Sequence, residues 1–60
     1  MNKSTITRLN NKHDVSIFNV TRFSGAYKMS FSMHTNYGTF QNIVVKRSET
    51  ISEVIEKVLN

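Results

Sequence analysis

The sequence predicts an α+β domain in which a three-stranded antiparallel sheet packs against one C-terminal amphipathic helix. Residues 26–35 alternate between apolar and polar side chains, which is the pattern of a strand with one buried face. Glycine-containing turn sequences at 24–25 and 36–38 separate this segment from two neighbours rich in β-branched and aromatic residues. Residues 50–59 combine a helix-capping signature with an apolar stripe of helical period.

The three expected strands cover residues 15–23, 26–35 and 39–46. In the middle strand we expect the core-facing side chains to be Tyr27, Met29, Phe31 and Met33. The opposite, helix-free face is then expected to carry Lys28, Ser30, Ser32 and His34. Both faces of the first strand are mixed in polarity, which leaves open a β-bulge or a second apolar surface there.

The two ends of the chain differ in how clearly they predict structure. Thr50 and Glu53 have the spacing of a capping box, in which each side chain accepts a hydrogen bond from the other residue's backbone N–H. The apolar stripe that follows consists of Ile51, Val54, Ile55, Val58 and Leu59. Residues 1–13 are polar and are interpreted as either a basic arm or a short extra strand at 5–9. A single domain of 1–60, with a βββα core over 14–60, is therefore expected.

Residue types exclude several kinds of chemistry. The chain has no cysteine, and no paired carboxylate accompanies its two histidines, His13 and His34, as a metal site would require. No serine or threonine lies in a nucleophile-elbow or phosphate-loop motif. We therefore predict a protein that is not an enzyme and that uses no metal or other cofactor. The polar N-terminus and the lack of a long apolar run predict a cytoplasmic protein without membrane contact.

Charge is distributed unevenly along the chain. Seven basic residues and one acid precede Ser48, a balance of +6, whereas three acids and one lysine follow from there, a balance of −2. A basic sheet half suits the neutralisation of phosphates. This distribution predicts a nucleic-acid partner.

The order strand–hairpin–strand–hairpin–strand–helix resembles the three-stranded DNA-binding domain at the N-terminus of tyrosine integrases, and plant ethylene-response DNA-binding domains look similar. The resemblance rests on residues 24–31 (SGAYKMSF), 37–40 (YGTF) and 47–54 (RSETISEV). In that family the sheet face opposite the helix enters the DNA major groove. The resemblance thus implies contacts to DNA by Arg22, Lys28, Ser30, Ser32 and His34, with Lys46 near the phosphates.

The sequence therefore predicts a small nucleic-acid-binding module, with DNA favoured over RNA. Beyond the six residues that the resemblance implies, the expected contacts are Arg47 and, on the N-terminal arm, Lys3, Arg8 and Lys12. The alternative is a small phage-type inhibitor or adaptor that binds a host protein through a sheet edge or an apolar sheet face, or that forms a homodimer. The two hypotheses predict different side chains on the helix-free face. A polar, basic face favours a nucleic-acid partner. An apolar face built from Phe18 and Val20 or Val44 favours a protein.

Overall fold

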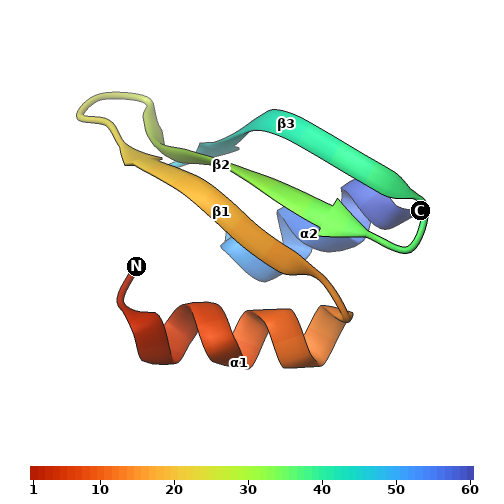
Figure 1. The fold of residues 1–60 in the computed structure, drawn as a ribbon. Coiled ribbons are helices and arrows are strands. Elements are labelled where there is room, and N and C mark those ends of the chain that lie inside the picture. Colours follow the sequence, from red (N-terminus) through yellow and green to blue (C-terminus); the bar gives the residue numbers. More distant parts are fainter.

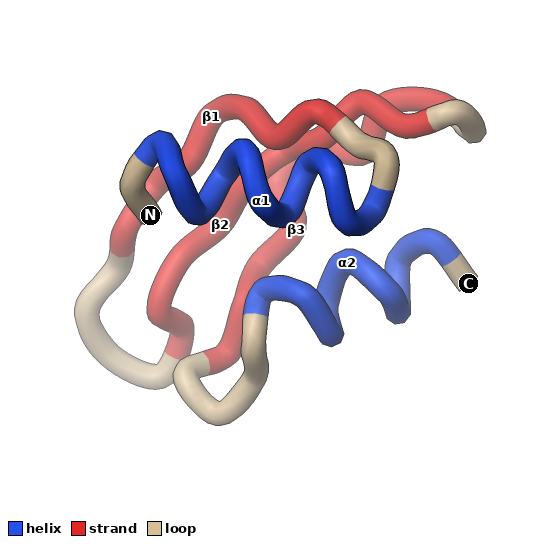
Figure 2. The backbone as a smooth tube through the Cα atoms, turned by 90° about the horizontal axis from the view of Figure 1, so that it is seen from below, coloured by secondary structure: helices blue, strands red, loops and turns tan.

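A computed structural model describes residues 1–60 as two layers, a sheet and a pair of helices. The elements follow in the order α1 (Lys3–His13), β1 (Ser16–Arg22), β2 (Tyr27–Thr35), β3 (Gly38–Lys46) and α2 (Ile51–Leu59). The strands form an antiparallel sheet of order β1-β2-β3, and both helices lie on the same face of it (Figures 1 and 2). The predicted α+β class, with its antiparallel sheet and C-terminal helix, is confirmed. Neither helix has the length and apolar character needed to cross a membrane.

The core lies between the sheet and the two helices. Alternate side chains of β2 provide its centre, because Phe31 and Met33 are fully buried and Met29 nearly so. The other buried apolar residues are Leu9, Val15, Ile17, Val45, Val54 and Ile55. Such a core is small, so each of its side chains contributes a large share of the stability.

Helix α2 forms as the sequence predicts. The Thr50 hydroxyl accepts a hydrogen bond from the Glu53 N–H at 3.1 Å, and the Glu53 carboxylate accepts one from the Thr50 N–H, which completes the capping box. Val54 and Ile55 are buried, and the remaining stripe residues pack against the core. The predicted stripe is therefore the buried face of the helix.

Residues 3–13 form a helix, so the expectation of a basic arm or an extra strand at the N-terminus was wrong. The Asn2 side chain caps the helix by accepting a hydrogen bond from the Thr5 N–H at 2.9 Å, and Asp14 ends it in the left-handed conformation. Leu9 is only 3% exposed. Burial of this side chain stabilises a segment whose Ser, Thr and Asn content gives it weak intrinsic helix propensity.

The face assignment of β2 fails at its first two residues. The register of β2 against β3 shifts between Tyr27 and Met29, a bulge that strict alternation does not anticipate. As a result Tyr27 is 48% exposed and borders a hollow with Val44 on the helix-free side, whereas Lys28 points beneath the sheet. Further register shifts occur at Asn19 in β1 and at Asn42 in β3, both with positive φ.

Candidate functional site

The helix-free face of the sheet is uncovered along its whole length (Figure 1). Along each strand, the residues between the core-facing ones direct their side chains to this face. The pairing of the strands aligns these side chains in rows across the sheet. These rows are Ser16–His34–Thr39, Phe18–Ser32, Thr21–Ser30–Val44 and Tyr27–Lys46. They contain hydroxyl groups, aromatic rings and one lysine but no acidic residue. The face therefore has aromatic and hydrogen-bonding groups side by side, and Asp14 borders it at one end, where it lines a hollow with Ser16 and His34.

An aromatic pair lies toward the end of this face at the β2–β3 hairpin. The rings of Phe18 and His34 stack at a centroid distance of 4.4 Å and an interplanar angle of 16°. His34 Nδ1 also lies 2.8 Å from the Thr39 hydroxyl, so the imidazole is held between β1 and β3. The ring orientation is thus fixed before any ligand arrives, which lowers the entropic cost of stacking a further planar group.

The structure places only some of the predicted contact residues on this face. Ser30, His34 and Lys46 lie there. Ser32 shares the face but is 2% exposed, and its hydroxyl accepts a hydrogen bond from the Asn42 N–H at 3.3 Å. Because Ser32 is shielded by its neighbours, it supports the sheet and is not free to read a ligand.

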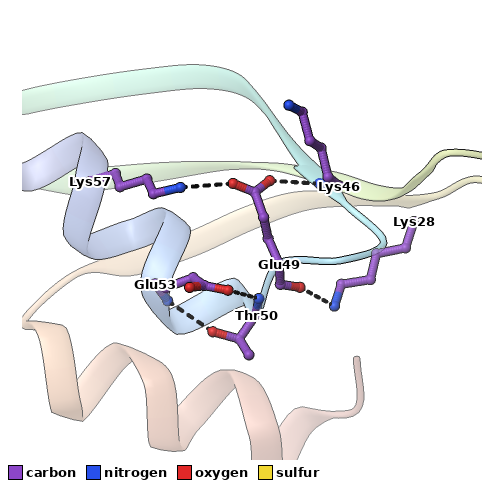
Figure 3. Close-up of polar contacts among 6 residues, drawn as sticks. All are labelled: Lys28, Lys46, Glu49, Thr50, Glu53 and Lys57. Atoms are coloured by element: carbon purple, nitrogen blue, oxygen red, sulfur yellow. Dashed lines mark hydrogen bonds and ion pairs between the residues drawn. The ribbon is translucent and has the colours of Figure 1, made fainter.

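Arg22 and Lys28 are turned to the opposite side, which corrects the prediction that they belong to the helix-free face. The bulge at Asn19 reverses the alternation of β1, so that Arg22 pairs with core-facing Met29. The Lys28 ammonium donates a hydrogen bond to the Glu49 carbonyl oxygen just before α2 (Figure 3). These two cations therefore do not belong to the open face of the sheet.

The remaining predicted cations are also separated from the open face. Arg47 donates from Nε to the Gly25 carbonyl at 2.7 Å and from Nη2 to the Phe23 carbonyl at 3.1 Å, which fastens the β1–β2 hairpin. The cations expected on an arm lie on α1, on the other side of the sheet (Figure 2); these are Lys3, Arg8 and Lys12. The predicted residues thus form no single surface.

An apolar hollow adjoins the face at the β1–β2 hairpin, and the prediction of contact residues missed it. It has a volume of about 520 Å³ and is lined by Phe23, Ser24, Ala26, Tyr27 and Val44. Phe23 and Val44 are 44% and 45% exposed. The sequence signal for it was a pair of aromatic residues flanking the Gly25 turn, whose φ of +104° lets the hairpin reverse tightly.

Glu49 organises the acidic side of the molecule (Figure 3). Its carboxylate accepts hydrogen bonds from the Lys46 N–H and from the Lys57 ammonium, each at 3.0 Å. The Lys46 N–H and then Lys57 hold the pKa of Glu49 below its usual value, and the Glu49 carboxylate in turn raises the pKa of Lys57. This acidic side lies beneath the sheet, away from the open face.

Metal-binding side chains do not converge in this fold. No three histidine, aspartate or glutamate side chains form a group that could hold a metal ion. The two histidines are instead engaged by hydroxyl groups: His13 Nε2 lies 2.7 Å from the Ser52 hydroxyl, joining α1 to α2, and His34 lies beside Thr39. The arrangement is suited to binding through stacking and hydrogen bonds.

No protein-family model, curated protein or solved structure matches this chain.

Proposed function

We propose that this protein binds single-stranded nucleic acid on the helix-free face of its sheet. The observation that carries the proposal is the composition of that face: the stacked Phe18–His34 pair, the exposed Tyr27 ring and Lys46 lie on one uncovered surface. Aromatic rings on a sheet offer stacking surfaces for unpaired bases, and a cation beside them attracts the phosphates.

A single strand fits this face better than the duplex that the integrase resemblance implies. Docking into a major groove requires several cations directed at the phosphates on either side. Lys46 is the only lysine or arginine in the rows of the open face, because Arg22 and Lys28 point beneath the sheet. Bases in a duplex are also stacked on one another and unavailable to Tyr27 or the Phe18–His34 pair.

Fluorescence anisotropy with labelled oligonucleotides tests the proposal. Single-stranded DNA and RNA should bind at 50 mM salt and weaken roughly threefold by 200 mM, as expected for the one phosphate that Lys46 neutralises. Duplexes of the same length should bind more weakly. If no oligonucleotide binds at 50 mM salt, the proposal is wrong.

Matched variants locate the binding surface. Tyr27→Ala should weaken binding about 5- to 160-fold, the usual effect of removing one base-stacking ring. Tyr37→Ala is its control, because Tyr37 is 81% exposed in the β2–β3 turn and outside the rows of the face. Lys46→Gln should lower the salt slope by about 0.7. Lys57→Gln, on α2, should leave the slope unchanged.

The apolar hollow supports a second candidate function, the binding of a protein. Val44 and the aromatic residues around it offer an exposed apolar surface at a sheet whose β3 edge pairs with no further strand. The variant Val44→Lys separates the two functions. It should no longer capture a protein partner that wild type captures in the presence of nuclease. Its binding of oligonucleotides should be retained or strengthened. Loss of oligonucleotide binding in folded Val44→Lys would count against the nucleic-acid proposal.

A further inference from the structure

Four of the cations that are absent from the open face gather around a hollow beneath the β1–β2 hairpin. This hollow, about 430 Å³ in volume, is lined by Arg22, Lys28 and Arg47 together with apolar Met29 and Ile51. A second hollow of about 380 Å³ adjoins it, shares Lys28 and Ile51 with it, and adds Arg8 from α1. We call these two together the basic hollow. Its cations come from α1, β1, β2 and the loop before α2, so the fold and not the local sequence brings them together.

The positive charge of the basic hollow is not neutralised by the protein. No acidic residue lines either part of it. Figure 3 shows the Glu49 carboxylate turned toward Lys46 and Lys57, on the far side of its backbone from Lys28. The Glu53 carboxylate is engaged by the Thr50 N–H. A cleft with charges of one sign and apolar walls concentrates the opposite ion, so an anion entering here would relieve the mutual repulsion of the cations.

Two of the cations are already held in place and retain free donors. Arg47 uses Nε and Nη2 to bind the hairpin carbonyls, which leaves three of the five guanidinium N–H groups available. Lys28 uses one of its three ammonium hydrogens on Glu49. Arg22 makes no hydrogen bond within the protein and is exposed, so its whole fork is free for an oxyanion. Arginine forks and a lysine point charge are the donors that phosphate groups select.

We infer that the basic hollow is a binding site for a phosphate group. Phe23 indicates where that phosphate comes from, because it borders both the basic hollow and the apolar hollow on the other side of the hairpin. A nucleic-acid strand with a base against Phe23 and Tyr27 can pass the hairpin and place its next phosphate against Arg22. This identification of the source rests on the proposed function; the phosphate site itself does not.

The phosphate site is tested with inorganic pyrophosphate and ¹⁵N-labelled protein. The Nε–Hε signals of Arg22 and Arg47 should shift saturably, and chloride at equal ionic strength should not reproduce the shifts. Arg22→Gln should weaken pyrophosphate binding about tenfold, as for loss of one charge-assisted pair, whereas Arg22→Lys should recover part of the loss. Lys12→Gln is the control, because Lys12 lies on α1 but lines neither part of the hollow. Absence of saturable shifts, or an unchanged affinity in Arg22→Gln, overturns the site.

Oligonucleotide binding by the same variants separates this inference from the proposed function. If a strand runs from the open face into the basic hollow, both Tyr27→Ala and Arg22→Gln should weaken its binding. If Tyr27→Ala weakens oligonucleotide binding and Arg22→Gln does not, the proposed function stands, but the strand does not place a phosphate in the basic hollow. If the protein binds pyrophosphate saturably but binds no oligonucleotide, the phosphate site stands. Both the nucleic-acid source of the phosphate and the proposed function are then wrong.

Discussion

The Lys28 ammonium donates a hydrogen bond to the main-chain carbonyl of Glu49 and thereby joins the start of β2 to the loop that leads into α2 (Figure 3). Because Lys28 is half-buried, its removal leaves that carbonyl without its protein donor. Lys28→Ala should lower the free energy of unfolding by about 1–2 kcal/mol, measured by urea denaturation. Lys12→Ala, at an exposed position of α1, should change it by no more than about 0.5 kcal/mol. Equal stabilities would show that the Lys28 contact contributes nothing.

The position of Lys28 illustrates what side-chain alternation can and cannot predict. Alternation identified the central core residues Met29, Phe31 and Met33 correctly, because a regular strand puts every second side chain on one face. It misplaced Tyr27 and Lys28, because a bulge at the start of β2 shifts the register there by one residue. A bulge depends on pairing with the neighbouring strand, and that pairing leaves no local mark in the sequence.

The candidate site was harder to predict than the fold for the same reason. Charge counting indicated a basic half of the chain but not which side of the sheet each cation occupies. Arg22 and Arg8 come together with Lys28 only through the bulge in β1 and the docking of α1. By contrast, Ser30 and His34 lie in the regular part of β2 and were assigned to the correct face.

Helix α1 was missed because its propensity is weak, although Asn2 offers a capping side chain and Ile6 and Leu9 have helical spacing. Its stability should therefore depend on tertiary packing. Leu9→Ala is expected to lower the free energy of unfolding by about 2–4 kcal/mol, because this side chain is 3% exposed. Thr7→Ala, exposed on the same helix, should have little effect. A Leu9→Ala protein as stable as wild type would show that α1 is not docked.

The packing of α2 gives a second test of the core. Ile55 is fully buried against the sheet, so Ile55→Ala should lower the free energy of unfolding by about 2–4 kcal/mol, measured by thermal or urea denaturation. Glu56→Ala is the neighbouring control, because Glu56 is exposed. If both variants unfold at the same midpoint, the apolar stripe of α2 is not the stabilising contact.

The N-terminus of α2 can be examined separately from its packing. Thr50→Ala should reduce stability by about 1 kcal/mol, because the Glu53 N–H loses its acceptor. Ser48→Ala, two residues earlier and outside the cap, should change stability much less. If Ser48→Ala loses more stability than Thr50→Ala, Thr50 is not the N-cap of α2.

The contacts of Glu49 predict how stability changes with pH. Hydrogen bonds from the Lys46 N–H and from Lys57 lower the pKa of Glu49 in the folded state. The carboxylate thus stabilises the fold above its unfolded pKa of about 4.3, and this contribution is lost as the pH falls through the lower folded value. Lys57 shows the opposite sign: the Glu49 carboxylate raises its pKa, so its contribution is lost as the pH rises through the folded value, above about 10.4.

Unfolding measured across pH should therefore distinguish two variants from wild type. Glu49→Gln keeps an acceptor for the Lys46 N–H but has no charge to lose, so its stability should fall less than that of wild type between about pH 5 and pH 3. Glu49→Gln should also lose less stability than wild type at alkaline pH, because Lys57 no longer has a charged partner. Lys57→Gln should remove the contribution of the Glu49–Lys57 pair to the loss of stability at alkaline pH. At acidic pH it should reduce the loss of stability only in part, since the Lys46 N–H still binds the Glu49 carboxylate. Wild type and Glu49→Gln following parallel curves below pH 5 would show that this carboxylate does not stabilise the fold.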